Sequence, residues 1–169
     1  MGTDIHGGIE FRHPGVDTDY YEGEPWVAAM DLWPLYDETD YAAFGCLFGV
    51  RNYAGFQPLA PERGLPVDLS SGMREKLGRC VAEGGLYGAS WVSWAELASM
   101  DLAAASPTDL HSATERVGRS ADGVMCTYEP RTVGTVLGPG TDWPHVFAVM
   151  KALAGRFGDD GVRLVVAFD

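Results

Sequence analysis

The sequence predicts an α+β fold: a single domain in which a mixed β-sheet packs against three or four helices. Segments with the two-residue period of strands alternate irregularly with segments of helical period, unlike the regular β–α order of a doubly wound sheet. The length of 169 residues and the 46% hydrophobic content fit one domain with a substantial core. No internal repeat or low-complexity linker divides the chain.

Strands are indicated by alternation or by runs of β-branched residues. The segment that begins at Asp4 places Ile5, Ile9 and Phe11 on one face and polar side chains on the other, as in a half-buried strand. The last segment, RLVVAF, is almost wholly apolar, which predicts burial on both faces and leaves parallel pairing open for the final unit. The expected strands are residues 4–12, 26–33, 123–136 and 163–168.

Helices are indicated mainly by their caps. Ser93 and Glu96 have the spacing of a capping box, in which each side chain bonds the backbone N–H of the other residue. Pro144 fits the first turn of a helix that opens at Asp142 and carries apolar residues at core spacing. The expected helices begin near residues 40, 70, 94 and 142, and a long ordered loop with three prolines covers residues 52–68.

The charge balance narrows the classes of partner. Twenty-four acids stand against 12 Lys and Arg, and the formal net charge of −12 leaves no basic face for nucleic acid or an anionic membrane. Residues 17–40 hold acids and no Lys or Arg, so this segment is either a cation-binding surface or simply a solvated face. Three widely spaced cysteines and an N-terminus without an apolar segment predict a cytoplasmic protein. Homo-oligomerisation stays open.

The most specific chemical pattern is Asp4-x-His6-x-x-x-Glu10. On a strand these three side chains share one face, and their oxygen and nitrogen donors suit one divalent metal ion such as Zn, Mn or Fe. Asp4 and His6 are the expected ligands, whereas Glu10 lies about 13 Å beyond His6 unless Gly7-Gly8 bends the strand. His6 and Glu10 are also candidate acid–base residues. The alternatives are a solvated strand face or a His6 that is held by a backbone carbonyl.

A second pattern places arginines in the proline-containing loop. Arg51 and Asn52, then Glu62 and Arg63, lie between aromatic residues, and Arg131 follows in the second half of the chain. Arginine binds carboxylate and phosphate groups through its planar fork, so these residues are candidate substrate anchors, with Glu62 as a further catalytic carboxylate. The alternative is that Glu62 and Arg63 pair with other groups of the loop and hold it in place.

Several blocks of the sequence resemble a family of small uncharacterised bacteriophage and bacterial proteins. That family carries the patterns MGxDIH, VRN, EPRGLP, SWLTxxEL and a C-terminal FDN. Here they correspond to MGTDIH, GVRNYAGF, APERGLP, SWVSWAEL and VVAFD, in the same order and across nearly the whole chain. The residues that fall on motif positions are Asp4, His6, Arg51, Asn52, Glu62, Arg63, Ser90, Trp91, Glu96, Arg131 and Asp169.

The resemblance implies no particular activity, but one departure from the family pattern matters. Where the family carries a histidine pair before Ser-Trp, this chain has Tyr87 and Ala89. If those histidines complete a metal site with Asp4 and His6, two ligands are missing here, and Tyr87 becomes a candidate substrate contact instead.

Two functions follow as hypotheses. In the first, the protein is a small enzyme that acts on a small polar or anionic metabolite through an Asp/His/Glu acid–base or metal centre and arginine anchors. In the second, it is a non-catalytic phage-type effector or binding protein that uses its acidic surface. The first hypothesis requires the acid–base residues and the arginines to converge in space.

Overall fold

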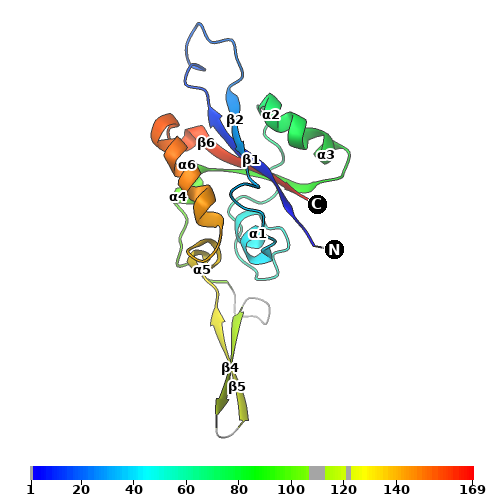
Figure 1. Cartoon of the computed structure of the whole chain (residues 1–169), viewed down its shortest axis with the longest axis vertical. Helices are drawn as coiled ribbons and strands as arrows, with labels where there is room; N and C mark the ends of the chain where they lie inside the picture. Colours follow the sequence, from blue (N-terminus) through cyan, green and yellow to red (C-terminus); the bar gives the residue numbers. More distant parts are fainter. Residues whose placement is uncertain (1, 107–112, 121–122) are drawn as a thin grey trace.

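The computed structural model describes residues 2–106, 113–120 and 123–169. Figure 1 shows a β-sheet with helices on both of its sides and a β-hairpin that extends away from it. The four strands of the sheet are ordered β2-β1-β6-β3, and the hairpin pairs β4 with β5. The strands are β1 (Ile5–Arg12), β2 (Trp26–Asp31), β3 (Tyr87–Ser93), β4 (Ala113–Ser120), β5 (Gly123–Pro130) and β6 (Val162–Phe168).

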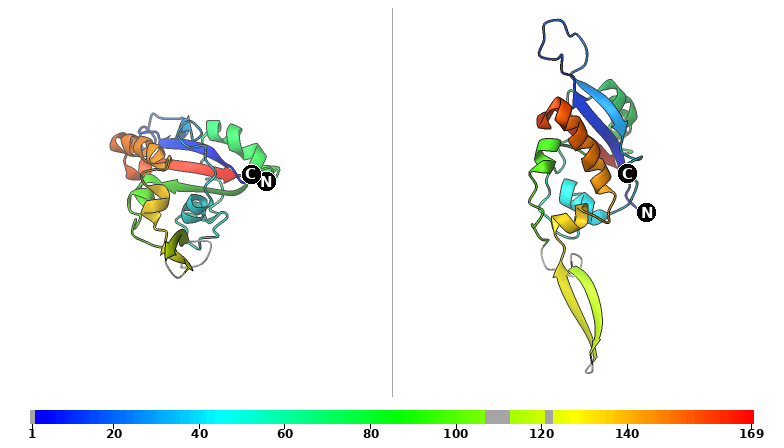
Figure 2. Two further views of the ribbon diagram at one scale, coloured as in Figure 1. Left: turned by 60° about the horizontal axis from the view of Figure 1, so that its bottom comes forward. Right: turned by 60° about the vertical axis from the view of Figure 1, so that its left-hand side comes forward.

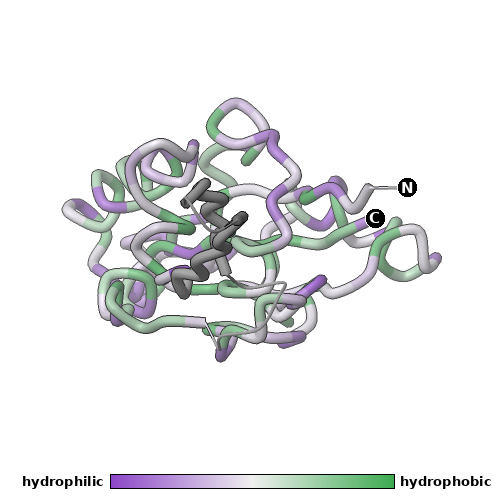
Figure 3. Tube along the Cα trace, turned by 90° about the horizontal axis from the view of Figure 1, so that it is seen from below, coloured by the Kyte–Doolittle hydropathy of each residue, from purple (hydrophilic) through white to green (hydrophobic). Residues whose placement is uncertain are grey.

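The α+β class is confirmed, but the sheet is antiparallel at each of its described strand pairs rather than mixed. The last strand, β6, lies between β1 and β3 and is antiparallel to both. It is buried along its whole length, as its apolar sequence predicts, and the segment that runs to the C-terminus is coloured mostly hydrophobic in Figure 3. Burial on two faces therefore explains the apolar run, without parallel pairing.

One face of the sheet carries the main core. Ile9 of β1 and Leu164, Val166 and Phe168 of β6 pack there against helices that supply Phe44, Met150 and other apolar side chains. The helices of the protein are α1 (Tyr41–Phe48), α2 (Ser71–Met73), α3 (Arg79–Ala82), α4 (Trp94–Ala98), α5 (Val133–Leu137) and α6 (Trp143–Phe157), with a π-helical turn η1 (Arg74–Gly78) and a 3₁₀ turn η2 (Asp159–Gly161).

The other face is covered by the continuous segment formed by α2, η1 and α3. Leu69, Met73 and Leu77 form a second apolar cluster there with Val165 of β6. Gly8 lets this segment approach, because a Cβ at that position would lie 3.0 Å from the Met73 sulfur and 2.7 Å from the Met30 carbonyl oxygen. The two faces of β1 thus lie in different surroundings, which decides what its polar residues can reach.

Most predicted helix starts are confirmed by their hydrogen bonds. The Asp40 carboxylate accepts from the backbone N–H of Ala42 and Ala43 at the start of α1. Ser93 and Glu96 form the predicted capping box of α4. Residues 71–82 and 143–157 are helical as expected, with Ser70 as the cap of the first segment, and residues 52–68 contain no helix or strand.

Two strand predictions were too long. Residues 26–33 form a strand only to Asp31, and Pro34 follows closely. The β-like stretch 123–136 ends at Pro130, and Thr132 then caps α5 by accepting from the Thr135 backbone N–H. The apolar residues after that cap have helical spacing, and they are buried.

The hairpin formed by β4 and β5 extends away from the sheet, as the right-hand view of Figure 2 shows. Its register runs from Ala113 opposite Pro130 to Ser120 opposite Gly123. Within the described residues, no helix is both long and apolar enough to cross a membrane.

Candidate functional site

The candidate site lies at the end of the sheet where β1 begins and β6 ends. The antiparallel register places Ile5 opposite Phe168 and His6 opposite Ala167. Both termini therefore lie at this end, as Figure 1 shows. The backbone N–H of Asp4 donates to an Asp169 carboxylate oxygen at 2.8 Å, and the Asp169 N–H donates back to the Asp4 carbonyl at 3.3 Å.

His6 has a carboxylate partner at this end of the sheet. Its Nε2 lies 3.3 Å from Oδ2 of Asp169, and both side chains are nearly half exposed, at 42% and 45%. The hydrogen bond from the Asp4 backbone, together with the contact to His6, lowers the pKa of Asp169. A partly exposed imidazole oriented by an ionised carboxylate is the arrangement used for acid–base catalysis. The Asp4 carboxylate accepts from the Thr39 hydroxyl at 2.7 Å.

Thr3 links this pair to the arginine of the loop. The Thr3 side chain is fully buried, and its hydroxyl accepts from Nε of Arg51 at 3.1 Å. The same hydroxyl lies 3.0 Å from the Tyr87 hydroxyl, and the Thr3 backbone N–H donates to Tyr41. The sequence patterns did not indicate Thr3, because it occupies the variable position of MGxDIH. Only its place before Asp4 on an alternating strand could have suggested that it faces the opposite side.

Arg51 lines a pocket of about 460 Å³ together with Arg131. Its Nη1 donates to the Tyr53 hydroxyl at 3.2 Å, and this hydrogen bond raises the pKa of the guanidinium. Among the described residues of the lining, the acid is Asp40, whose carboxylate is already bonded to the first turn of α1. In a protein of net charge −12, two arginines facing one bonded carboxylate make a locally cationic pocket.

A second pocket, of about 410 Å³, is lined by Arg51, Glu62 and Tyr87 with Gly49 and Val50. Arg51 and Glu62 are also the non-glycine residues with positive φ in the described chain, at +50° and +41°. Left-handed backbone at such residues costs about 1–3 kcal/mol and clusters at functional sites. The strained backbone positions and the predicted site residues therefore coincide.

This strain gives a testable prediction for Glu62. Glu62→Gly is expected to stabilise the protein by about 0.5–1 kcal/mol relative to Glu62→Ala, because glycine adopts a positive φ without penalty. Urea unfolding of the two variants measures the difference, and both lose the same carboxylate. Equal unfolding free energies would show that the left-handed backbone at this position carries no strain.

Glu10 is not part of this site. It shares a face of β1 with His6, as predicted, but its carboxylate is fully buried and bonded to Arg163 at 2.7 Å and to the Ser70 backbone N–H at 2.9 Å. The register of β1 with β6 is regular from Ile5 to Phe11, so Gly7 and Gly8 do not bend the strand toward His6. The register of β1 with β2 shifts between Ile9 and Glu10, not at Gly7-Gly8, so the expected bend that would bring Glu10 to His6 is not formed.

Arg63 and Asn52 are engaged in contacts that hold the loop in place. Arg63 forms a bidentate pair with Glu96 at 2.9 and 2.6 Å and donates to the Trp91 carbonyl. The Asn52 side chain bonds both backbone polar groups of Phe56 and so holds the turn in place. The contacts of these two residues therefore fit the alternative of a loop-stabilising role. The other predicted site residues surround one end of the sheet: Asp4, His6, Arg51, Tyr87, Glu62 and Arg131.

The Arg63–Glu96 pair makes stability depend on pH. The hydrogen bond from Arg63 lowers the pKa of Glu96. A lowered folded-state pKa means that the unfolded chain binds more protons, so the pair stabilises above the unfolded value of about 4.3 and this contribution is lost as the pH falls through the folded value. As the pH is lowered from 7 to 3, the free energy of unfolding is expected to decrease less steeply in Glu96→Gln than in the wild type. Identical slopes would contradict the assignment.

Within the described ranges, no group of three or more His, Cys, Asp or Glu side chains is placed to hold a metal ion. Asp4 and His6, the predicted ligands, lie on the network around Asp169. Comparison with known proteins adds nothing to this description: no family model, curated protein or solved structure matches the chain.

Proposed function

We propose that the protein is a small cytoplasmic enzyme that acts on a small polar or anionic metabolite at the β1 end of the sheet. His6 serves as the acid–base residue and Arg51 as the substrate anchor. The observation that carries the proposal is the dipeptide Thr3-Asp4, which bonds Arg51 directly and bonds the carboxylate that contacts His6. Thr3 accepts from Arg51, and Asp4 donates to the carboxylate that partners His6.

The anchoring role follows from the charges and the unused donors of Arg51. Its Nε and Nη1 donate to Thr3 and Tyr53, and Tyr87 is also within hydrogen-bonding reach of the guanidinium. A guanidinium carries five N–H groups, so further donors are left for a ligand oxygen. Arg131 lines the same pocket and adds a second positive charge. A carboxylate or phosphate bound there would pair with Arg51, which has no acidic partner among the residues whose side chains the structure describes. The hydroxyls of Tyr53 and Tyr87 can donate to the polar groups of the same ligand.

The catalytic role follows from the surroundings of His6. A half-exposed imidazole can exchange a proton with a ligand, and Asp169 fixes the orientation of the ring. Glu62, at the wall of the second pocket, offers a further carboxylate for proton transfer. The reaction class that fits is proton transfer to or from a small anionic substrate.

A metal-dependent version of this proposal uses Asp4 and His6 as ligands of one divalent ion. Elemental analysis of the purified protein tests it directly. Zinc, manganese or iron near one equivalent in the wild type, and its loss in His6→Ala, would support this version. A metal content that is the same in both proteins would count against these two ligands.

Ligand-dependent thermal stability tests the proposal as a whole. Inorganic phosphate, malate and a panel of small anionic metabolites are added to the wild type, Arg51→Gln and Arg79→Gln, whose arginine lies on the exposed side of α3 with 81% of its side chain accessible. The proposal expects at least one anion to raise Tm in the wild type and in Arg79→Gln but not in Arg51→Gln. An equal rise in all three proteins would contradict it.

The second candidate is a non-catalytic binding protein. It draws on the acidic segment after β1, where Tyr20 is 85% exposed and the Asp17 side chain 77% exposed. An exposed aromatic residue among acids suits a basic protein partner. An interaction screen in which Tyr20→Ser abolishes capture of a partner, while Arg51→Gln retains it, would favour this candidate over the enzyme.

A further inference from the structure

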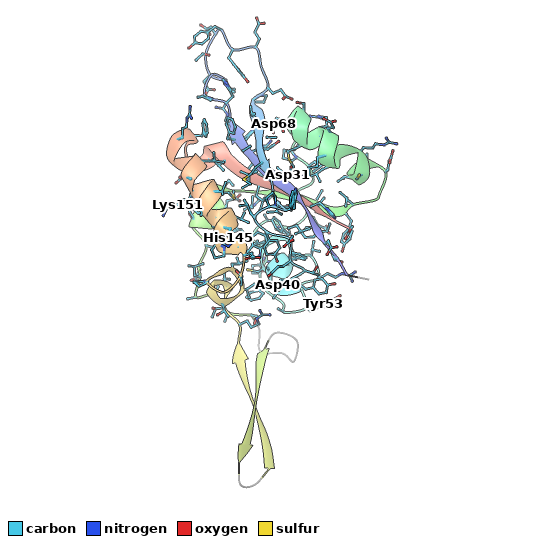
Figure 4. All side chains as sticks on the ribbon, in the orientation of Figure 1. Asp31, Asp40, Tyr53, Asp68, His145 and Lys151 are labelled. Carbon is cyan, nitrogen blue, oxygen red and sulfur yellow. The ribbon has the colours of Figure 1, made fainter. Side chains whose placement is uncertain are left out.

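A larger cavity, of about 660 Å³, lies at a different part of the sheet. Trp26 of β2 and Trp91 of β3 contribute its aromatic wall, and residues 65–67 of the loop its apolar rim. Figure 4 shows Asp68, which lines this cavity, well separated from Tyr53 and Asp40 of the site described above. The cavity is thus independent of the proposed catalytic site.

The floor of the cavity is built from buried charge. Arg163 of β6 is almost fully buried, and it bonds Glu10 at 2.7 Å and Asp68 at 3.0 Å. Its guanidinium lies 3.9 Å from the centre of the Trp26 ring and 5.9 Å from that of Trp91. A buried ion pair of this kind seldom adds net stability over apolar packing, so stability alone does not account for it.

Both arginines that line the cavity are already paired. Arg163 is held by two carboxylates, and Arg63 is held by the bidentate contact with Glu96 while lying 5.0 Å from the centre of the Trp91 ring. Among the charged side chains of the lining, Asp160 is the one without an ion pair or hydrogen bond in the described part of the chain. The carboxylates of Asp68, Glu96 and Asp160 outnumber the two arginines, and Glu10 lies beneath them.

The chemistry of the walls favours a positively charged ligand with a flat or apolar body. Tryptophan faces attract ammonium and guanidinium groups, as the contacts of Arg163 with Trp26 and of Arg63 with Trp91 show. Trp26 is buried beneath Arg163, so the partly exposed Trp91 is the ring that can contact a ligand. An anion would meet an excess of carboxylates and no unpaired arginine. An amine or guanidinium would meet the free carboxylate of Asp160 and the apolar rim.

We propose that the cavity between Trp26 and Trp91 binds a small organic cation, either a primary amine or a guanidinium compound, with Asp160 as the counter-ion. This inference goes beyond the proposed function, because it concerns a second ligand at a site that shares no lining residue with the Arg51 pockets. The protein would then take an anion at one end of the sheet and a cation in the tryptophan cavity.

Isothermal titration with agmatine, which carries both an amine and a guanidinium group, tests the proposal. Saturable binding is expected in the wild type, with about tenfold weaker binding in Asp160→Asn. The matched control is Asp159→Asn, which removes the same charge from the neighbouring residue, one that does not line the cavity. Agmatine affinity in this control is expected to stay within about twofold of the wild type, since its carboxylate makes no direct contact.

A second variant and an anionic probe complete the test. Trp91→Leu is expected to weaken agmatine binding about fivefold through loss of the aromatic face. Inorganic phosphate is expected not to compete with agmatine. Absence of saturable agmatine binding to the wild type would overturn the proposal, as would equal weakening in Asp160→Asn and Asp159→Asn, or displacement of agmatine by phosphate.

Discussion

Arg163→Met is expected to lower the free energy of unfolding by about 3–5 kcal/mol. The substitution leaves the Glu10 carboxylate, which is fully buried, without its charged partner. It also removes the guanidinium from the Trp26 ring and from Asp68. An uncompensated buried charge is among the largest single penalties in a folded protein, so the effect should exceed that of removing an exposed pair. Urea unfolding monitored by far-UV circular dichroism measures it.

The control is Arg79→Met, which breaks an exposed pair with Glu83 on α3. Its expected effect is below about 0.5 kcal/mol, because exposed i,i+4 pairs contribute little. The double variant Glu10→Leu/Arg163→Met is expected to regain most of the lost stability, since both buried charges are then absent. A loss in Arg163→Met no larger than that in Arg79→Met would show that the Glu10–Arg163 pair is not buried as described.

His6→Gln is expected to reduce the activity on the proposed anionic substrate by about 10²–10⁴-fold, the range for loss of a general acid–base group. Glutamine keeps a polar side chain of similar reach but cannot take up a proton near neutral pH. Because His6 is nearly half exposed, the variant is expected to unfold within about 0.5 kcal/mol of the wild type. Steady-state kinetics, with a thermal melt of each protein, separates the two effects.

His145→Gln provides the matched control for this variant. His145 is also partly exposed and also lies near an aspartate, with Nε2 3.7 Å from Oδ1 of Asp142 at the start of α6. Neither histidine lines the pockets around Arg51, but His6 contacts Asp169, which is bonded to Asp4, whereas His145 lies on α6 beside Asp142. Activity is expected to remain at the wild-type level. If both histidine variants lose activity equally, or if neither does, His6 is not the acid–base residue.

The sequence predicted the local elements better than their assembly. Caps are read from a few neighbouring residues, so Asp40 and the Ser93–Glu96 capping box could be assigned before the structure was known. The direction of β6 depends on its neighbours in the sheet, and an apolar run is the same for parallel and antiparallel burial. The helix α5 was missed because the composition of residues 123–136 is typical of strands. Pro130 ends the strand, and Thr132 caps the helix that follows.

The same limit applies to the candidate site. A period of two placed His6 and Glu10 on one face of β1, but it carried no information about which element covers that face. The segment of α2, η1 and α3 buries Glu10 and leaves His6 accessible. Likewise, the composition of the loop indicated both Arg51 and Arg63 as substrate anchors. Only the fold shows that Arg51 lies beside Thr3, whereas Arg63 is paired with Glu96.

The most direct test of the central proposal is a map of amide chemical shifts on titration with inorganic phosphate and malate. The proposal expects one of these anions to shift Thr3, Arg51 and Tyr87 at the β1 end together with His6, since one hydrogen-bonded network joins them. The amides of Trp26 and Trp91 are expected to stay in place. Shifts confined to the tryptophan cavity, or saturating shifts that leave Thr3 and Arg51 unchanged, would contradict the assignment of the anion site.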